Sequence, residues 1–159
     1  MSAVNPYKLF ALPLEYQLDA AEVEAVYFVK LRQCHPDRNA RANAETQASC
    51  ETETAVVNEA YAVLQNPVQR GQALLAALGQ ESALPQVAPE TLMAVLEWQE
   101  RRQQDSAAAM NVYQQTRNSL EARILIAFKE RDYKETARLL AMLWYWMRAD
   151  VHGSMHPAL

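Results

Sequence analysis

The chain is poor in glycine and cysteine, and it has no long apolar run. Its 159 residues include three glycines and two cysteines, and few stretches alternate apolar and polar residues as half-buried strands do. Two cysteines are too few for a disulfide framework or a zinc-finger spacing, and such thiols usually pack as small apolar side chains. No apolar run reaches the roughly 20 residues of a membrane span. These absences predict an all-helical protein with reduced thiols and no membrane partner.

The charge and the first residues narrow the class further. The formal net charge is −4, whereas a protein that neutralises phosphates needs clustered Lys and Arg, so we expect no nucleic-acid partner. The segment from Met1 to Pro6 has neither the basic and apolar regions of a secretory signal nor the Arg-rich pattern of a transit peptide. It therefore predicts a cytoplasmic protein.

Helical periodicity and helix-breaking residues predict seven helices. Pro6 and Pro67 stand at positions that favour the first turn of a helix, and Asp19 is a plausible cap for the second helix. Pro36 ends that helix, because the residue before a proline avoids the α region, and Gly79 suits the end of the fourth. The first predicted helix is short and ends at Leu12-Pro13, the second follows Asp19, residues 37–44 form a loop, and the others span about 44–65, 67–78, 89–104, 107–130 and 132–151.

A short polar stretch, residues 79–88, is the best domain boundary. We expect an N-terminal domain over residues 1–78, a linker, and a bundle over residues 89–152, since short connections between long helices favour antiparallel neighbours. The last predicted helix is apolar nearly all round from Leu139 to Met147, so it is either central to the core or part of a second interface. Residues 153–159 are expected to be a disordered tail, and we interpret His152 and His156 as tail residues rather than metal ligands.

A His-Pro-Asp tripeptide lies between two predicted helices. His35, Pro36 and Asp37 follow the amphipathic run of residues 23–34, and a second motif, residues 58–64, comes after a polar gap. The proline fixes a rigid turn, which gives the Asp37 carboxylate a defined position for a bidentate pair with a partner's arginine. Taken alone, the tripeptide is better explained as a closed turn with a solvated face.

Basic residues gather around this tripeptide. Residues 1–78 contain six Lys and Arg against nine Asp and Glu, whereas residues 30–41 contain four basic residues against Asp37 alone. A basic patch on an acidic domain can steer association with an acidic surface. The four basic residues are Lys30, Arg32, Arg38 and Arg41.

The order of these motifs resembles a J-domain, the module that makes a DnaK-type chaperone hydrolyse ATP. The second motif, Asn-Glu-Ala-Tyr-x-x-Leu, is followed by Asn66-Pro67 and Arg70, at the expected distance from the tripeptide. The resemblance implies that the chaperone is contacted by Lys30, Arg32, His35, Pro36, Asp37 and Arg38. Asn58, Tyr61 and Leu64 are assigned to structure, where they would hold the third helix against the second.

The predicted helix over residues 89–104 has an unusually wide apolar arc. At about 100° per residue, Leu92, Met93 and Leu96 lie on one edge and Val95 and Trp98 on the other, over roughly 220°. One buried face needs an arc of only about 100°. Either all five side chains are core, or the first three are partly exposed and form a protein-binding surface that also holds a carboxylate.

The chain resembles the HscB family, J-domain co-chaperones of iron–sulfur cluster assembly. The opening Leu-Phe-x-Leu-Pro of residues 9–13, the Tyr-Gln-Leu-Asp of residues 16–19, and Leu-Met-x-x-Leu-Glu-x-x-Glu of residues 92–100 carry this resemblance. It implies two partners, the DnaK-type chaperone HscA and the scaffold protein IscU. It also implies scaffold contacts by Leu92, Met93, Leu96, Glu97, Glu100 and Met142, the last standing where the family usually has an aromatic residue.

The resemblance implies a protein that is not an enzyme and needs no cofactor, with any cluster held by the scaffold. Animal mitochondrial members carry an N-terminal cysteine motif that this sequence lacks, which favours a bacterial form. One alternative is a J-domain co-chaperone with a different client. A thiol enzyme built on Cys34 and His35 is disfavoured, because adjacent helical residues point about 100° apart.

Overall fold

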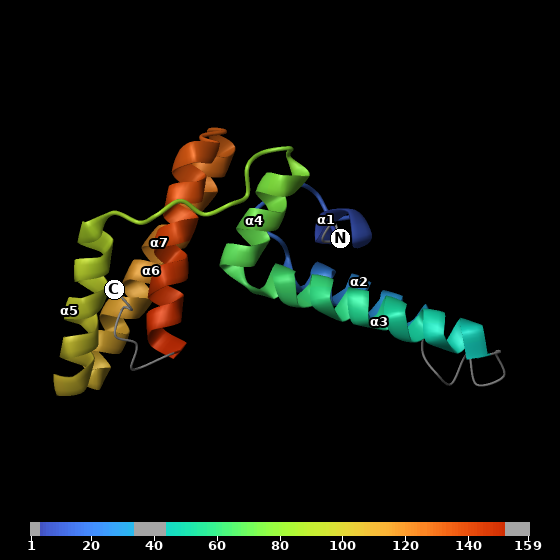
Figure 1. Ribbon diagram of the computed structural model, residues 1–159, viewed down its shortest axis with the longest axis horizontal. Coiled ribbons are helices and arrows are strands. Elements are labelled where there is room, and N and C mark those ends of the chain that lie inside the picture. Colours follow the sequence, from blue (N-terminus) through green and yellow to red (C-terminus); the bar gives the residue numbers. More distant parts are fainter. Residues whose placement is uncertain (1–3, 34–43, 152–159) are drawn as a thin grey trace. The chain divides into compact units, whose positions relative to one another are not determined.

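The computed structural model describes residues 4–33 and 44–151, and all regular secondary structure in these ranges is helical (Figure 1). The predicted all-α fold is therefore confirmed, and the predicted helices from the third onward agree with the structure to within one residue at each end. The predicted loop up to residue 43 and the tail lie outside the described residues. The helices are α1 Pro6–Leu9, α2 Ala20–Gln33, α3 Ala44–Gln65, α4 Pro67–Ala77, α5 Pro89–Gln104, α6 Ser106–Lys129 and α7 Tyr133–Val151.

The same dipeptide, Asn-Pro, begins both α1 and α4. The Asn5 side-chain oxygen accepts hydrogen bonds from the amides of residues 7 and 8 at 3.0 and 3.3 Å. Asn66 does the same for residues 68 and 69 at 3.0 and 3.1 Å. The following proline has no amide to leave unpaired, so the dipeptide both starts the helix and satisfies its first turn. Asp19 caps α2 in the same way, as predicted, with the amide of residue 21 at 2.8 Å.

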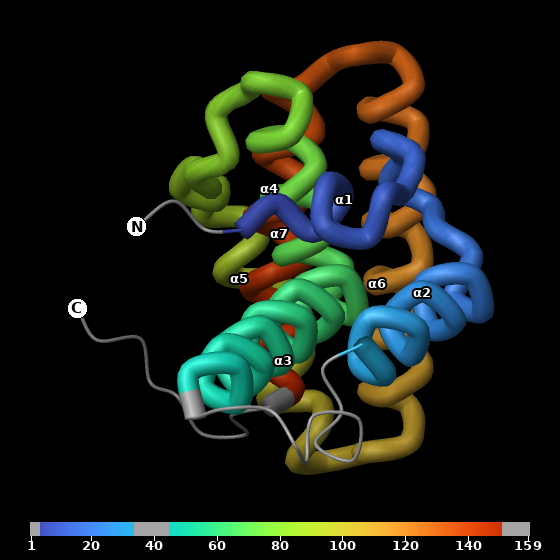
Figure 2. The backbone as a smooth tube through the Cα atoms, turned by 90° about the vertical axis from the view of Figure 1, so that its right-hand side faces the viewer, coloured from blue at the N-terminus to red at the C-terminus, as the bar shows by residue number. Residues whose placement is uncertain are grey.

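The chain divides into two compact units, residues 1–80 and 81–159. In the first unit, α2 and α3 run side by side, and α1 packs against α3 and α4 (Figures 1 and 2). The buried side chains of α3 lie in its C-terminal half, and α2 buries only Val23. The core therefore sits at one end of the α2–α3 hairpin, where its largest fully buried members are Tyr7, Phe10, Val57, Leu74 and Leu75.

The second unit is a three-helix bundle of α5, α6 and α7, in which each helix packs against the other two. Its buried side chains are spread along the whole length of α6 and α7. One side of α7 is buried, with Leu139, Leu140, Leu143 and Trp146. For this side, the prediction that the last helix is central to the core is confirmed. Trp144 is exposed instead, with its ring against Tyr145 and under the guanidinium of Arg148.

Three helices, α1, α4 and α6, end in the same hydrogen-bonding pattern. In α4, the Gly79 amide donates to the Ala76 carbonyl at 3.1 Å, and the Gln80 amide donates to the Leu75 carbonyl at 2.8 Å. The pattern requires a left-handed residue just after the helix, which an L-residue adopts at a cost of about 1–2 kcal/mol. The three left-handed residues are Ala11 (φ 52°), Gly79 (φ 72°) and Arg131 (φ 58°). Only at Gly79 does glycine avoid this cost.

Candidate partner-binding sites

The residues of the Asn-Glu-Ala-Tyr-x-x-Leu motif fasten α3 to α2. The Tyr27 hydroxyl of α2 donates to the Asn58 side-chain oxygen of α3 at 2.9 Å. Its ring stacks on Tyr61, with centroids 4.0 Å apart and an interplanar angle of 15°. Leu64 is buried further along the same helix. The predicted structural role of Asn58 and Tyr61 is thus confirmed.

Arg70 closes the corner between α3 and α4. Its guanidinium donates to the Leu64 carbonyl at 3.0 Å and lies 4.8 Å from the centre of the Tyr16 ring. The Tyr16 hydroxyl in turn donates to the Pro67 carbonyl at 3.2 Å. Side chains of the Asn-Pro-x-x-Arg motif therefore satisfy the Leu64 carbonyl near the end of α3 and the first amides of α4.

The structure places part of the predicted chaperone-binding surface. Lys30 and Arg32 lie in the last turn of α2, where Lys30 is half-buried and Arg32 is exposed. His35, Pro36, Asp37 and Arg38 lie outside the described residues, and so do Cys34 and Arg41. The roles of these residues in chaperone binding stay predictions.

Sequence reasoning missed two exposed apolar side chains on α2, Phe28 and Val29. The amphipathic run of residues 23–34 has Val23, Val26 and Tyr27 at helical spacing, and in the structure Val23 is buried and the other two are half-buried. A signal was available, because residues 27, 28 and 29 are consecutive and cannot share one face of a helix. We call Phe28, Val29 and Arg32 the α2 face.

The apolar side chains of α5 fall into a buried set and an exposed set, as the second of the two interpretations of this helix predicted. Val95 and Trp98 are buried, whereas Leu92, Met93 and Leu96 are 39%, 57% and 39% exposed. The all-core alternative is wrong. Glu97 and Glu100 are also exposed. We call Leu92, Met93, Leu96, Glu97 and Glu100 the α5 patch, and its role in scaffold binding stays a prediction.

Trp98 fixes the rotation of α5 about its own axis. Its indole N–H donates to the Ala109 carbonyl of α6 at 2.7 Å, in a buried position. Its ring lies against Tyr113 of α6 and Trp146 of α7, with centroids 5.7 and 5.8 Å away. A rotated α5 would leave a buried donor without a partner, which costs about 1–3 kcal/mol. The α5 patch is therefore held outward by the opposite side of its own helix.

Arg102 holds the other end of α5 against α7. Its guanidinium lies 5.4 Å from the Trp98 ring centre and donates to the Asp150 carbonyl at 3.2 Å. The Asp150 carboxylate is 3.6 Å away. This contact ties the last turn of α5 to the last turn of α7.

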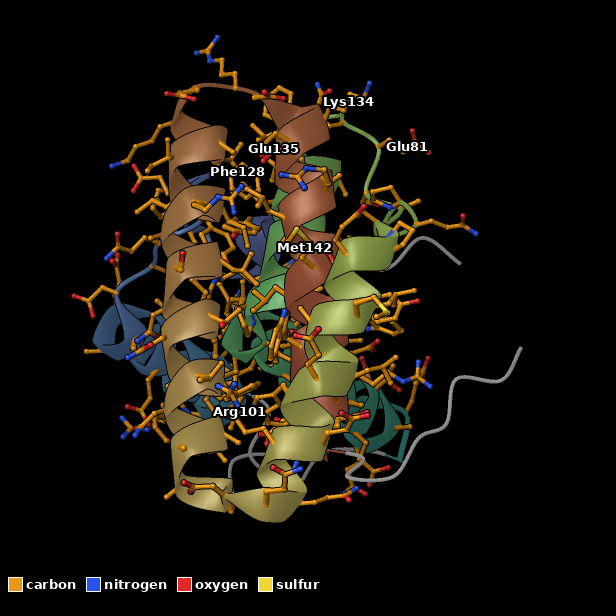
Figure 3. The ribbon with its side chains drawn as sticks, turned by 90° about the vertical axis from the view of Figure 1, so that its left-hand side faces the viewer. Glu81, Arg101, Phe128, Lys134, Glu135 and Met142 are labelled. Carbon is orange, nitrogen blue, oxygen red and sulfur yellow. The ribbon has the colours of Figure 1, made fainter. Side chains whose placement is uncertain are left out.

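Met142 lies half-buried on α7, a helix that packs against α5 (Figure 3). The Arg138 guanidinium approaches its sulfur at 3.5 Å and makes two hydrogen bonds of 2.6 Å to Glu135. These bonds from Arg138 lower the pKa of the Glu135 carboxyl. Met142 is thus flanked by a side chain that is already paired.

The sequence of the first unit matches the DnaJ domain family over residues 5–72. This match, together with the geometry of α1 to α4, defines a J-domain protein, a class that acts on a DnaK-type chaperone. Over 151 residues the chain is 29% identical to a co-chaperone protein HscB homolog of Haemophilus ducreyi, which covers 92% of this chain and 84% of that protein. Over 131 residues it is 32% identical to the Haemophilus influenzae homolog, with 74% and 75% covered. The chain belongs to the HscB family and is a J-domain co-chaperone.

Two solved structures share the fold of the whole chain. The human co-chaperone protein HscB aligns with a TM-score of 0.82 over 96% of this chain and 82% of its own. The chaperone HscB from Vibrio cholerae aligns with a TM-score of 0.82 over 94% and 95%. Both are 21% identical in sequence and show the fold alone. No helix within the described ranges is long and apolar enough to cross a membrane.

Proposed function

We propose that this protein stimulates ATP hydrolysis by the DnaK-type chaperone HscA and delivers the iron–sulfur scaffold IscU to it, in the bacterial cytoplasm. Membership of the HscB family and the bacterial relatives support this proposal. The observation that carries it is the division of α5, which buries Val95 and Trp98 and leaves Leu92, Met93 and Leu96 exposed. The cluster is cargo on the scaffold, and the co-chaperone contributes binding surfaces rather than catalytic residues.

The chaperone side of the proposal rests on a docked carboxylate. The carboxylate of Asp37 would pair with an arginine of the ATPase, and His35 and Pro36 would contact the same partner. Lys30, Arg32 and Arg38 supply the charge that attracts an acidic surface. The chaperone can be driven toward hydrolysis only if these groups contact its hydrolysing state better than its resting state.

The scaffold side rests on the α5 patch. Leu92, Met93 and Leu96 supply the apolar centre, and burying such side chains stabilises a complex by about 25 cal/mol for each Å² removed from water. Glu97 and Glu100 form an acidic rim that selects against acidic partners. Met142 adds a further apolar contact, with a more adaptable side chain than an aromatic ring.

The test is steady-state ATP hydrolysis by HscA, with this protein and IscU added singly and together. We expect the two to act synergistically, and we expect His35→Gln to remove the synergy while leaving the helical fold unchanged. Absence of any stimulation by the folded protein would reject the proposed function.

A J-domain co-chaperone with a different client is the second candidate. It predicts stimulation by the protein that does not change when IscU is added, and no measurable complex between the two proteins. A direct titration of the bundle's tryptophan fluorescence with IscU separates the two candidates, because all three tryptophans lie in the second unit.

A further inference from the structure

The first unit exposes apolar side chains on α2 that its own core does not use. Phe28 is 49% exposed and Val29 is 55% exposed. At about 100° per residue from the buried Val23, these two lie at about 140° and 240°, and Arg32 lies between them at about 180°. The Phe28 ring leans on Tyr27, with centroids 5.4 Å apart. An aromatic ring that is already restricted in this way loses little conformational entropy when it is covered.

The second unit exposes an apolar surface of the opposite charge. In the α5 patch, three apolar side chains between 39% and 57% exposed lie beside the exposed carboxylates of Glu97 and Glu100. Residues 90–100 contain three acidic residues and no basic one, whereas both basic residues of α2 are in its last turn. The end of α2 and the α5 patch are therefore complementary in charge, and both have apolar surface to bury.

Charge decides which of these surfaces can pair between two copies of the chain. A contact between two α2 faces would bring Arg32 of each copy toward the other, and a contact between two α5 patches would bring carboxylates together. Like charges at a contact are unfavourable, and unlike charges fix the register of an interface. The pairing that gains from both apolar burial and charge is an α2 face on an α5 patch.

The spacing of apolar and charged residues along the two helices also matches. Arg32 follows Phe28 by four residues, just as Glu100 follows Leu96, and four residues are about 6 Å of helix rise. If the two helices lie parallel, their apolar side chains meet while Arg32 lies beside the carboxylates. An antiparallel alignment would instead bring Glu24, four residues before Phe28, toward the carboxylates. The parallel alignment is therefore favoured.

We propose that the α2 face of one copy docks on the α5 patch of a second copy, so that the free protein self-associates reversibly. The two surfaces are far smaller than the roughly 20–30 residues a side of a standard interface, so the association is weak and grows with protein concentration. It does not require the proposed function. A partner that occupies the α5 patch of one copy would release the α2 face of its neighbour, which makes the self-contact an inhibitory one.

The test is sedimentation equilibrium of the full chain from about a micromolar to about a millimolar, the range of weak association. Phe28→Gln with Val29→Gln removes the apolar part of the α2 face, and Leu92→Gln with Leu96→Gln removes that of the α5 patch. Glutamine is a good helix former, and circular dichroism checks that the helices are kept. Each variant leaves the other surface intact.

The controls are Leu14→Gln and Ile126→Gln. These side chains are 50% and 53% exposed, and each unit contains one of them. The average mass of the wild type is expected to rise above the 18.0 kDa of one chain as concentration increases. Each double variant is expected to raise the dissociation constant at least about tenfold, as central apolar anchors of interfaces do, and each control by less than about twofold.

A one-to-one mixture of the two double variants is the decisive sample. The intact α5 patch of one variant can meet the intact α2 face of the other, so we expect the mixture to regain a dimer that neither variant forms alone. Recovery in the mixture would also show that both variants are folded, since an unfolded partner offers no surface.

A charge exchange repeats the test with exposed side chains that lie outside the core. Arg32→Glu and Glu100→Arg are each expected to weaken self-association by about two- to fivefold, the range of an exposed ion pair. Mixing the two variants should restore it, because each altered charge then meets its opposite. High salt should weaken the wild-type association for the same reason.

A wild type with the mass of one chain at every concentration would overturn the inference. A dimer that is lost in only one of the double variants, or that neither mixture restores, would mean that like surfaces pair and would also overturn it. None of these results depends on ATPase stimulation or on IscU, so the proposed function would stand in each case.

Discussion

The α2 face and the α5 patch are built alike but carry opposite charge. In each, apolar side chains are exposed on a helix whose other side is held by an aromatic residue: Tyr27 behind the α2 face and Trp98 behind the α5 patch. The α2 face includes Arg32, whereas the α5 patch includes Glu97 and Glu100. Under the proposed function, the charge that surrounds each contact would help to sort the two partners, because a mismatched charge opposes the wrong pairing.

The two surfaces also differ in how firmly their helices are held. Trp98 is buried and bonded, and the buried side chains of α6 and α7 run the length of the bundle. Tyr27 is only half-buried, and α2 buries Val23 alone. Helices with few buried contacts open more readily. The α5 patch is thus on a rigid support, and the α2 face is on a softer one.

The largest expected effect would separate the two surfaces completely. Asp37→Asn should abolish ATPase stimulation and leave IscU affinity unchanged, because the substitution removes the charge from one site only. Leu92→Ala with Leu96→Ala should do the reverse and weaken IscU binding about tenfold or more. ATPase assays and a binding titration measure the two effects. Ile126→Ala is the matched control, since Ile126 is also an exposed apolar residue of the bundle. Loss of both activities in either variant would contradict the two-surface comparison.

A second prediction concerns the two aromatic supports. Trp98→Ala should lower the stability of the bundle by about 3–5 kcal/mol, as expected when a buried tryptophan is truncated. Tyr27→Ala should cost less, since its ring is half-buried. All three tryptophans lie in the second unit, so urea unfolding followed by the fluorescence of Trp144 and Trp146 reports the bundle alone. A Tyr27→Ala transition that shifts this signal would show that the two units do not unfold independently.

A third prediction compares the helix ends of the two units. Ala11→Gly and Arg131→Gly should each stabilise their own unit by about 0.5–1 kcal/mol, because relief of the left-handed strain exceeds the added freedom of the unfolded chain. Gly79→Ala should destabilise by a similar amount; a methyl group there would meet no atom within 4 Å, so its cost is purely conformational. Thermal unfolding measures all three, and a stabilising Gly79→Ala would refute the explanation.

The smallest expected effect is at Glu135, which pairs with the same Arg138 that approaches Met142. Hydrogen bonding by Arg138 lowers the pKa of this carboxyl, so the pair adds stability above the carboxyl's unfolded pKa and loses it as the pH falls through the folded pKa. Glu135→Gln should therefore destabilise by about 0.2–1 kcal/mol at neutral pH and not at all in acid. Unfolding at several pH values in low and high salt tests this. An effect that persists in acid would mean that packing is responsible.

Local signals predicted the helices well, whereas contacts between helices were predicted only where a motif indicated them, as at Asn58 and Tyr61. Proline, glycine and capping residues such as Asn5, Asn66 and Gly79 act within a few positions, so the sequence is sufficient to locate helix ends. Helical geometry alone left Leu92 and Leu96 either in the core or partly exposed, and the packing of α5 in the structure decides for exposure. The bond from Trp98 to the Ala109 carbonyl joins two helices and has no local signature.

Two other features escaped prediction for different reasons. The left-handed conformation of Arg131 is imposed by the hairpin of α6 and α7, and an arginine at this position does not predict it. The exposure of Phe28 and Val29 depends on which of several apolar sides of α2 meets α3, and this choice is made by the contacts of Tyr27 with Asn58 and Tyr61.

Under the proposed function, the segment between α4 and α5 would link the two bound partners. The fourth helix ends at Ala77 and the next begins at Pro89, with no helix between them. A connection this short keeps whatever is bound to one unit at an effective local concentration of about a millimolar near whatever is bound to the other. A client too dilute to meet the chaperone by free diffusion would then be captured by proximity, even if its direct affinity for that chaperone were weak.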